Sequence, residues 1–310
     1  MRIIRDYHFI EDQDRGATVA IGNFDGVHIG HQSVIEMARA ANPNAPLGVM
    51  TFEPHPRAYF APDAPNFRLM SPEARSSRLE KLGVERLYEL NFNTAMASLT
   101  PREFAQNVIA DGLGLAHVVV GADFCFGKGR VGKTSDLIEF GKEMGFGVTI
   151  APLLAEDKNT VSSTAIRTAL AEARPDDAAK MLGHWHRIEG PVIGGEQRGR
   201  ELGYPTANMS VDGLHLPALG VYAVIFDVLD GPHMGSYHGV ASLGVRPMFG
   251  ENKPNIETFV FDFSGDLYGA HASVALVAYL RGEENFDGLE TLIKQMDADS
   301  AEARKILGVL

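Results

Sequence analysis

Cysteine is almost absent from this sequence, since Cys125 is the only one among 310 residues. A disulfide within the chain and a zinc site built from several thiolates are therefore both excluded. A single cysteine is typical of proteins kept in a reducing compartment, so we expect a cytoplasmic protein.

Long apolar runs and an excess of basic residues are also absent. No run approaches the roughly 20 apolar residues of a membrane-spanning helix, and the first residues lack the apolar core of a signal peptide. The formal net charge of −12 argues against a broad basic face for nucleic acid. We expect small-molecule partners, no nucleic acid, no membrane, and at most a weak homo-oligomer.

Glycine is abundant, with 33 residues of 310 against a usual share of about 7%. The most informative glycine-rich stretch follows the apolar run Thr18–Ile21 and leads into a helical pattern after His31. A helix that begins after a tight turn offers free N–H groups and a partial positive charge to a phosphate. His28 and His31 would face the same side of that helix, although such a pair is more often structural.

The pattern of segments divides the chain in two. Residues 1–183 alternate between strand-like and helix-like segments, which predicts a mostly parallel α/β sheet covered on both faces. From residue 184 onward, short apolar segments recur between turn residues, as in an antiparallel barrel or sandwich. A helical run is expected through residue 182, and two helices, 286–296 and 301–307, are expected at the end.

A second helix start in the first half carries hydroxyl groups. Ser162, Ser163 and Thr164 precede the helical run, and Arg167 lies three residues after Thr164. Donors fixed at helix ends stabilise the negative charge that develops in adenylyl transfer without any acid–base role. Three hydroxyl residues there are also an ordinary helix cap, and the basic loop 128–133 does not match the Walker spacing.

The second half has oxygen ligands and a carboxylate at informative positions. Thr206 and Asn208 are two residues apart in a Pro-Thr-Ala-Asn run, so in an extended chain they share a face. Neutral oxygens of this kind suit Mg²⁺ that is also bound by ATP, although the run could also be a simple turn. Glu257 begins an apolar strand, where it suits a general base or an edge position facing solvent.

Several motifs resemble, in order, those of the bifunctional bacterial riboflavin kinase/FAD synthetase (FMN adenylyltransferase) family. In the first half they are Gly-Asn-Phe-Asp-Gly-Val-His-Ile-Gly-His at 22–31, Thr-Phe-Glu-Pro-His-Pro at 51–56, Gly-Ala-Asp-Phe-Cys-Phe-Gly at 121–127 and Val-Ser-Ser-Thr-Ala-Ile-Arg at 161–167. In the second half they are Pro-Thr-Ala-Asn at 205–208 and the segments 239–247, 256–262 and 266–269. The resemblance covers nearly the whole chain.

The resemblance implies a two-step enzyme that uses ATP twice. Riboflavin is phosphorylated to FMN, and FMN is then adenylylated to FAD with release of pyrophosphate; Mg²⁺ is the implied cofactor. The implied fold is an N-terminal Rossmann-like nucleotidylyltransferase domain with a parallel sheet, residues 1–183. A C-terminal antiparallel β-barrel riboflavin kinase domain with terminal helices, residues 184–310, follows it.

The resemblance also implies the residues of both sites. His28 and His31 would be the catalytic phosphate ligands of adenylyl transfer, with Asp123 and Phe124 near the flavin. Glu257 would be the base that takes the proton of the ribityl 5′-hydroxyl, and Arg281 would belong to a mobile wall over the flavin. The adenylyltransferase ATP site would comprise Gly22, Asn23, Phe24, Asp25, His28, His31, Ser163, Thr164 and Arg167. The kinase ATP site would comprise Gly195, Gly199, Arg200, Thr206 and Asn208, the last two also holding the metal.

Four positions depart from the family pattern: Ala165, Cys125, Gly194 and Met248. Ala165 stands where arginine is often found, and Cys125 where a basic or polar residue is common. These departures leave open a chain in which only the kinase is active. A flavin-binding module without turnover is a further alternative, but such a module has no need of a base such as Glu257.

Overall fold

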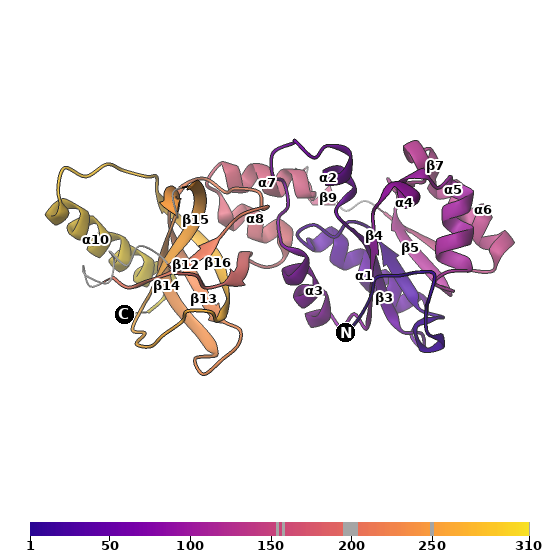
Figure 1. Cartoon of the computed structure of the whole chain (residues 1–310), viewed down its shortest axis with the longest axis horizontal. Helices are drawn as coiled ribbons and strands as arrows, with labels where there is room; N and C mark the ends of the chain where they lie inside the picture. Colours follow the sequence, from indigo (N-terminus) through magenta and orange to yellow (C-terminus); the bar gives the residue numbers. More distant parts are fainter. Residues whose placement is uncertain (153–154, 157–158, 195–203, 249–250, 310) are drawn as a thin grey trace. The chain divides into compact units, whose positions relative to one another are not determined.

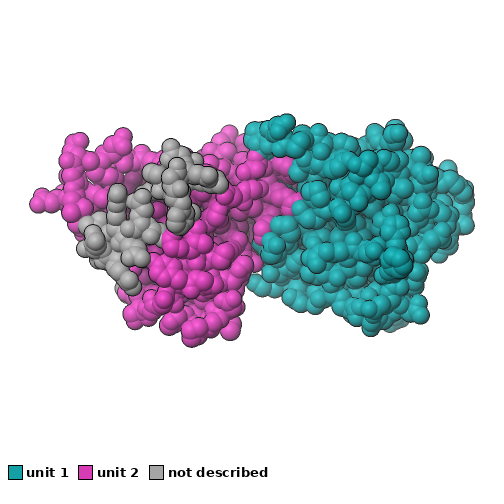
Figure 2. All heavy atoms as spheres, in the orientation of Figure 1, with its two compact units in different colours: residues 1–65, 72–161 teal, residues 66–71, 162–310 magenta. Residues whose placement is uncertain are grey.

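The computed structural model describes residues 1–152, 155–156, 159–194, 204–248 and 251–309 (Figure 1). Contacts divide the chain into unit 1, residues 1–65 and 72–161, and unit 2, residues 66–71 and 162–310 (Figure 2). Residues 162–183, which the sequence analysis grouped with the first half, therefore pack within unit 2. The functional boundary between 183 and 184 stays a prediction.

Unit 1 is built on a parallel sheet of six strands in the order β1-β4-β3-β2-β5-β8. The strands are β1 (Arg2–Ile4), β2 (Thr18–Ile21), β3 (Leu47–Glu53), β4 (Arg86–Asn91), β5 (His117–Gly121) and β8 (Gly147–Ala151). Every residue of β2 is buried, as expected for a central strand of a sheet with helices on both faces. The parallel α/β sheet predicted for this half is confirmed.

The helices of unit 1 begin where the sequence carries capping residues. Pro72 opens a helix after Ser71 as predicted, and Thr100 and Glu103 form the predicted capping box. The predicted helix after Thr100 continues with π-helical turns at Phe104–Ala110. The helices are α1 (Ile29–Ala41), α2 (Pro56–Phe60), α3 (Pro72–Lys81), α4 (Thr94–Ser98), α5 (Pro101–Glu103) and α6 (Thr134–Met144). Shorter elements are 3₁₀ turns at Asp12–Asp14 and Lys128–Arg130 and the paired strands β6 (Cys125–Phe126), β7 (Gly132–Lys133), β9 (Ala155–Glu156) and β10 (Asn159–Thr160).

The strand order of the sheet reverses between β2 and β5. After β2 the chain moves outward to β3 and β4, and it later continues on the other side with β5 and β8. In open parallel sheets a ligand crevice lies outside the carboxyl ends of the strands at such a reversal. The loop that follows β2, residues 22–28, and the turn that follows β5, residues 122–124, therefore share the ligand edge of the sheet.

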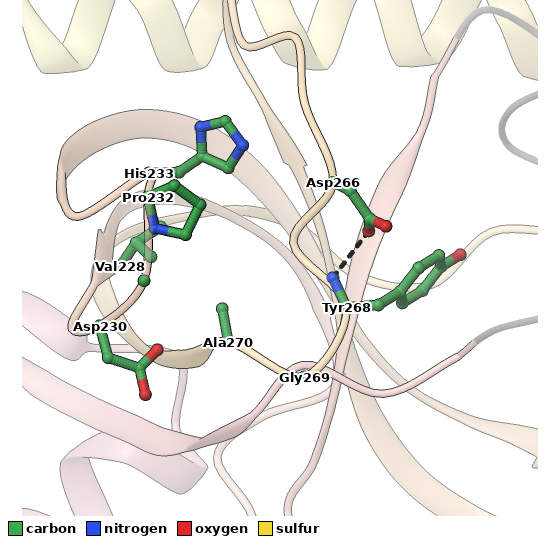
Figure 3. A pocket seen from close by; sticks show the side chains of 9 residues that line it. Val228, Asp230, Pro232, His233, Asp266, Tyr268, Gly269 and Ala270 are labelled. Carbon is green, nitrogen blue, oxygen red and sulfur yellow. Dashed lines mark hydrogen bonds between the residues drawn. The ribbon is translucent and has the colours of Figure 1, made fainter.

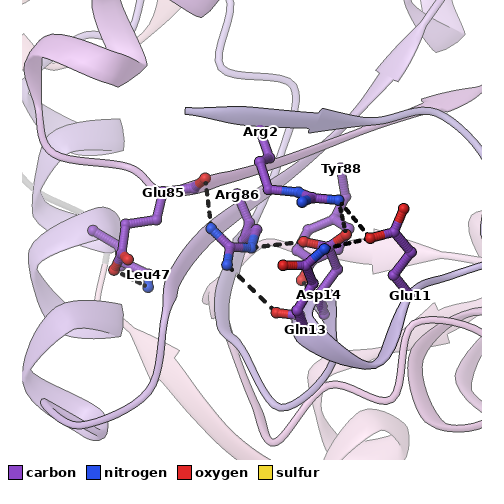
Figure 4. A network of polar contacts seen from close by, with 8 residues as sticks. All are labelled: Arg2, Glu11, Gln13, Asp14, Leu47, Glu85, Arg86 and Tyr88. Atoms are coloured by element: carbon purple, nitrogen blue, oxygen red, sulfur yellow. Dashed lines mark hydrogen bonds and ion pairs between the residues drawn. The ribbon is translucent and has the colours of Figure 1, made fainter.

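A buried ion network holds the opposite, amino end of the sheet (Figure 4). Asp14 is 3% exposed and forms ion pairs of 2.8 Å with both Arg2 and Arg86. The hydroxyl of Tyr88 donates to the Asp14 carbonyl oxygen at 2.6 Å, and burial raises the pKa of that hydroxyl. Because a buried carboxylate is tolerated only when it is paired, this network serves the stability of unit 1.

The helical part of unit 2 differs from the prediction. The single helical run expected through residue 182 is wrong, because the chain forms α7 (Ser163–Ala171) and α8 (Pro175–Leu182). Ala173 adopts a left-handed φ of 59°, and the proline that opens α8 cannot continue a preceding helix. The two helices and the segment 66–71 bury a small core made of Leu69, Ile166, Ala169, Leu170, Ala178 and Leu182.

The rest of unit 2 is an antiparallel sheet in the order β11-β16-β13-β14-β15-β12. The strands are β11 (His186–Pro191), β12 (Thr206–Ser210), β13 (Gly220–Val228), β14 (Gly235–Met248), β15 (Glu251–Val260) and β16 (His271–Arg281). A bridge between Ile193 and Asn208 joins the two edges of the sheet, with a hydrogen bond of 2.8 Å from the Ile193 N–H. The predicted antiparallel barrel is thereby confirmed.

One helix, α10 (Leu289–Leu307), replaces the two helices that were expected at the end of the chain. The acidic stretch around Asp299 looks like a break in the sequence, but Asp299 accepts hydrogen bonds from Arg281 and Gln295 and so stays helical. The helix packs Ala303 against Phe261 on the outer face of the sheet. Within the described ranges, no helix has the length and apolarity that crossing a membrane requires.

Candidate functional sites

The loop after β2 has a strained, fixed shape. Phe24 and Val27 adopt positive φ angles of 52° and 43°, which side chains of their kind rarely do. Both side chains are fully buried, and their packing holds this conformation. The Thr51 hydroxyl also donates to the Asn23 carbonyl oxygen at 3.1 Å and ties the loop to β3. The loop is therefore a rigid platform at the ligand edge.

His28 and His31 lie together at the start of α1. His28 caps this helix, because its Nδ1 accepts a hydrogen bond of 3.3 Å from the His31 backbone N–H. The two rings are stacked, with centroids 3.7 Å apart and planes 15° apart. Gly30 makes room for this stack, since a Cβ atom there would lie 3.1 Å from two atoms of the His28 ring.

The electrostatics of the site favour a neutral His31 ring. Burial, and then the neighbouring His28, hold the pKa of His31 well below its ordinary value. Nδ1 of His31 is buried and has no hydrogen-bond partner among the residues that the structure describes. A buried ring nitrogen in this position suits a ligand that forms hydrogen bonds. A neutral His31 ring that donates a hydrogen bond fits the charge-stabilising role that was predicted for this pair.

The other residues predicted for the first site lie in both units. Asp25 is buried in the loop after β2, and Asp123 is exposed after β5. Phe124 is half-buried and stacks on Phe126, with ring centroids 5.6 Å apart. The strand reversal brings the segments of Gly22–Asp25 and Asp123–Phe124 to one edge of the sheet.

Ser163, Thr164 and Arg167 belong to α7 and therefore to unit 2. The helix is capped by Ser162, whose hydroxyl accepts from the Ala165 N–H at 3.2 Å. Arg167 donates from Nε to the Phe67 carbonyl oxygen at 2.5 Å, and its guanidinium lies over the Phe67 ring. Their grouping with the histidines of unit 1 stays a prediction.

Sequence reasoning missed a cluster of aromatic side chains in unit 1. The cluster comprises Phe52 near the end of β3, Tyr59 and Phe60 in α2, and Phe92 directly after β4. Four edge-to-face pairs, with centroids 5.1 to 5.7 Å apart, connect these rings. Phe60 is 67% exposed. The signal was the position of aromatic residues just after two strand ends, where a parallel sheet binds ligands.

The predicted kinase residues share one face of the barrel sheet. Asn208 on β12 lies directly opposite Glu257 on β15, and Glu257 lies opposite Ser242 on β14. Thr206 is two residues before Asn208 and so points to the same face. The structure thus brings together the two predicted metal ligands and the predicted base.

Asn255 is a further residue of this face that was not predicted from the sequence. Its Nδ2 donates hydrogen bonds of 3.3 Å to Asn208 Oδ1 and to Glu257 Oε1. Asn208 in turn donates from Nδ2 to the Thr206 carbonyl oxygen at 3.3 Å. Asn208 and Asn255 are only 4% and 3% exposed. The available signal was the two-residue spacing between Asn255 and Glu257 within a strand.

The donor set of this face fits a hard cation. The hydroxyl of Thr206 and the amide oxygen of Asn208 are neutral oxygen ligands, which Mg²⁺ accepts when phosphates supply the negative charge. In the described part of the chain, no group of three or more His, Cys, Asp or Glu side chains could hold a metal ion. Gly195, Gly199 and Arg200 lie outside the described residues.

Arg281 is engaged by the terminal helix. It forms a two-pronged ion pair with Asp299, at 2.9 Å from Nε and 2.7 Å from Nη2. The hydrogen bonds that Arg281 donates to Asp299 raise the pKa of this guanidinium, which also lies 5.6 Å from the Phe286 ring centroid. Arg281 thus joins the end of β16 to α10, and its predicted flavin contact stays a prediction.

A hollow of about 300 Å³ lies between the β13–β14 turn and the segment before β16 (Figure 3). Its lining residues include Asp230, His233, Asp266 and Tyr268. The same segment pairs with Val192, whose N–H and carbonyl bond to Ala270 and Gly269 at 2.9 Å. The hollow therefore lies beside the chain that leads into the predicted glycine-rich loop of the kinase site.

Comparison with known proteins agrees with the division of the chain into a parallel α/β half and an antiparallel barrel half. The FAD synthetase family model matches residues 10–165, and the riboflavin kinase family model matches residues 182–307. The bifunctional riboflavin kinase/FMN adenylyltransferase of Pseudomonas fluorescens is 40% identical over 99% of this chain and 98% of its own length. That of Bacillus subtilis is 36% identical over 98% and 96%. A crystal structure described as a macrolide-efflux protein from Streptococcus pneumoniae is 32% identical, with a TM-score of 0.84 and 98% of each chain covered.

Proposed function

Because this chain belongs to the family of bifunctional riboflavin kinase/FMN adenylyltransferases, we propose that its two reactions use the two sites described above. The chain phosphorylates riboflavin to FMN with one ATP and adenylylates FMN to FAD with another. The main support for the position of the adenylyltransferase site is the stacked His28–His31 pair, because this pair lies at the strand reversal of the sheet.

In adenylyl transfer, an oxygen of the FMN phosphate attacks the α-phosphorus of ATP. The bond from this phosphorus to the bridging oxygen breaks, and pyrophosphate leaves with the electron pair. The ring N–H groups of His28 and His31 donate to the phosphate oxygens on which charge develops. No proton transfer is required, which agrees with the lowered pKa of His31. Ser163, Thr164 and Arg167 close on the phosphates, and the loop from Gly22 to Asp25 lines the nucleotide.

We assign the flavin of FMN to the aromatic cluster of unit 1. An exposed ring such as Phe60, held edge-to-face against Tyr59 and Phe92, offers a flat apolar surface to a planar ring system. Asp123 and Phe124 follow β5 at the carboxyl edge of the same sheet, which supports their proposed contact with the flavin.

In the kinase reaction, Glu257 takes the proton of the ribityl 5′-hydroxyl as the oxygen attacks the γ-phosphorus of ATP. The bond from this phosphorus to the bridging oxygen breaks, and ADP leaves. Thr206 and Asn208 would hold Mg²⁺, which when bound neutralises phosphate charge. Direct hydrogen-bonded proximity of Asn208, Asn255 and Glu257 supports this assignment.

We assign the adenylyltransferase function to residues 1–183 and the kinase function to residues 184–310. The family matches, which end at 165 and begin at 182, support a boundary in this region. A cytoplasmic location is supported by the single cysteine and by the use of ATP in both reactions.

A product assay tests both site assignments. The enzyme is incubated with ATP and Mg²⁺, with riboflavin in one series and FMN in the other, and FMN, FAD and pyrophosphate are measured. His28→Ala abolishes FAD formation and spares FMN formation, whereas Glu257→Gln abolishes FMN formation and spares FAD formation from supplied FMN. Equal loss of both products in either variant refutes two separate sites. Absence of FAD and pyrophosphate from the wild-type chain supports the kinase-only alternative.

A further inference from the structure

The amide group of Asn255 lies between the predicted base and a predicted metal ligand of the kinase site. Asn255 and Glu257 are two residues apart on β15, so their side chains share a face, and Asn208 faces Glu257 across the strand pair. The two hydrogen atoms on Asn255 Nδ2 serve two acceptors, Asn208 Oδ1 and Glu257 Oε1, each at 3.3 Å. A single side chain thus connects both functional groups.

The orientation of this chain of amides is fixed at both of its ends. The carboxylate of Glu257 only accepts hydrogen bonds, so the Asn255 atom beside it is the NH₂ group. The carbonyl oxygen of Thr206 also only accepts, so the NH₂ group of Asn208 points toward it. The Asn208 oxygen therefore turns toward Asn255, which agrees with the third hydrogen bond of the series.

We propose that Asn255 is a positioning residue for riboflavin phosphorylation, which holds the Glu257 carboxylate and the Asn208 amide oxygen in a fixed relation. This inference rests on the roles proposed above for Asn208 and Glu257. One hydrogen bond from Asn255 occupies one of the two lone pairs of the Asn208 oxygen, and the other lone pair suits a cation. The bond to Glu257 holds the orientation of its carboxylate relative to Asn208.

The cost of burying Asn255 supports a positioning role. Its side chain is 3% exposed, and burial of an amide carries a free-energy cost that only hydrogen bonds offset. The neighbouring residue Thr258 is also buried, on the opposite face, and its hydroxyl has no hydrogen-bond partner among the described residues. Thr258→Val keeps the shape of that side chain and is therefore a matched control on the same strand.

The test compares Asn255→Leu and Asn255→Asp with Thr258→Val in the full-length enzyme. Both Asn255 variants keep a similar volume and lose the two N–H donors. Loss of a hydrogen bond that orients a metal ligand costs about 10- to 100-fold in metal affinity or activity, so kcat for riboflavin phosphorylation falls by that factor. FMN adenylylation by the same molecules stays within about twofold, and Thr258→Val changes neither reaction by more than about twofold.

One further measurement on Asn255→Leu separates positioning from a structural role. With ¹⁵N-labelled asparagine and Mn²⁺·ADP as the probe, the Asn208 side-chain signals broaden in the wild type. The variant needs about tenfold more Mn²⁺·ADP for the same broadening. Fluorescence of Trp185, the only tryptophan, verifies that unit 2 is folded in each variant.

Unchanged kcat and unchanged broadening in folded Asn255→Leu overturn the proposal, as does an equal fall of both reactions. If Asn255→Leu does not fold, the same unchanged values in Asn255→Asp overturn it. The roles of Asn208 and Glu257 are tested separately by Asn208→Ala and Glu257→Gln. If these two variants lose phosphorylation while both Asn255 variants keep it, only the positioning role fails. If Glu257→Gln keeps phosphorylation, the assignment of the base fails.

Discussion

The substitution Gly30→Ala should lower the rate of FMN adenylylation while leaving the stability of unit 1 nearly unchanged. Gly30 is the second residue of α1, and the added atom in Gly30→Ala would lie 3.1 Å from Cε1 and Nδ1 of His28. Ordinary contacts begin at 3.4 Å, so the His28 ring must retreat by at least about 0.3 Å. Retreat disturbs the 3.7 Å stack on His31 and the hydrogen bond that caps the helix.

Two opposing terms decide the free energy of unfolding of Gly30→Ala. Alanine in place of glycine in a helix stabilises by about 0.5–1 kcal/mol. Weakening of the His28 cap costs about 0.5–1 kcal/mol. These terms nearly cancel, so we expect the stability of unit 1 to change by less than about 0.5 kcal/mol. The rate of adenylylation has no such compensation, because displacement of a positioned catalytic group by 1 Å lowers the rate about 100-fold.

For the smaller displacement expected here, kcat/KM of FMN adenylylation should fall about tenfold. The assay measures FAD and pyrophosphate from FMN and ATP, with riboflavin phosphorylation by the same sample as the internal control. Gly190→Ala is the matched control, because a Cβ atom at Gly190 meets nothing within 4 Å. Wild-type adenylylation in Gly30→Ala refutes the placement of His28 at the reacting phosphates.

Four further changes give distinct outcomes. Asp14→Asn removes the buried partner of two arginines and should lower the free energy of unfolding of unit 1 by about 3 kcal/mol. Urea titration followed by circular dichroism measures this change. A loss below about 0.5 kcal/mol, within the usual range of a surface substitution, contradicts a stabilising role of the ion network. Burial lowers the pKa of His186 to about 3. As pH falls below about 6.5, the unfolded chain therefore binds a proton that the folded chain does not, and the free energy of unfolding falls by about 2 kcal/mol at pH 5. His186→Leu should remove this loss in urea titrations followed by Trp185 fluorescence, and an unaltered pH dependence refutes the assignment. Phe60→Ala should raise KM for FMN about fivefold without changing stability, because the ring is mostly exposed. His215→Leu removes a 3.0 Å hydrogen bond to a carbonyl oxygen of α7 and should lower kcat/KM of adenylylation about fivefold; an equal effect on phosphorylation contradicts this reasoning.

Local signals in the sequence predicted much of unit 1. Two helix starts depend only on residues a few positions apart, namely the capping box at Thr100 and Glu103 and the start at Ser71-Pro72. Such local features can be predicted from the sequence without knowledge of tertiary contacts. The alternation of apolar runs and helical patterns likewise predicted the parallel sheet. The spacing of His28 and His31 predicted two rings on one side, and the structure stacks them.

Features that depend on distant contacts were not predictable in this way. The acidic stretch of α10 stays helical because Arg281 pairs with Asp299, 18 residues away. Asn255 could be connected to Asn208 only after the strand register was known, because the two residues are 47 positions apart. The aromatic cluster around Phe60 could be predicted only once β3 and β4 were known to be neighbouring strands.

The contacts of α7 explain why the family match, the contact unit and the proposed function have different boundaries. The FAD synthetase match runs to residue 165 and includes Ser163 and Thr164, yet α7 belongs to unit 2. The Leu170 carbonyl accepts from the Ala218 N–H at 2.9 Å, and the Arg167 carbonyl bonds to the His215 ring at 3.0 Å. Groups proposed to close on the phosphates of one reaction are thus held by residues of the kinase half. A change that shifts the segment before β13 should therefore shift α7 as well, and with it the groups that are proposed to act in adenylyl transfer.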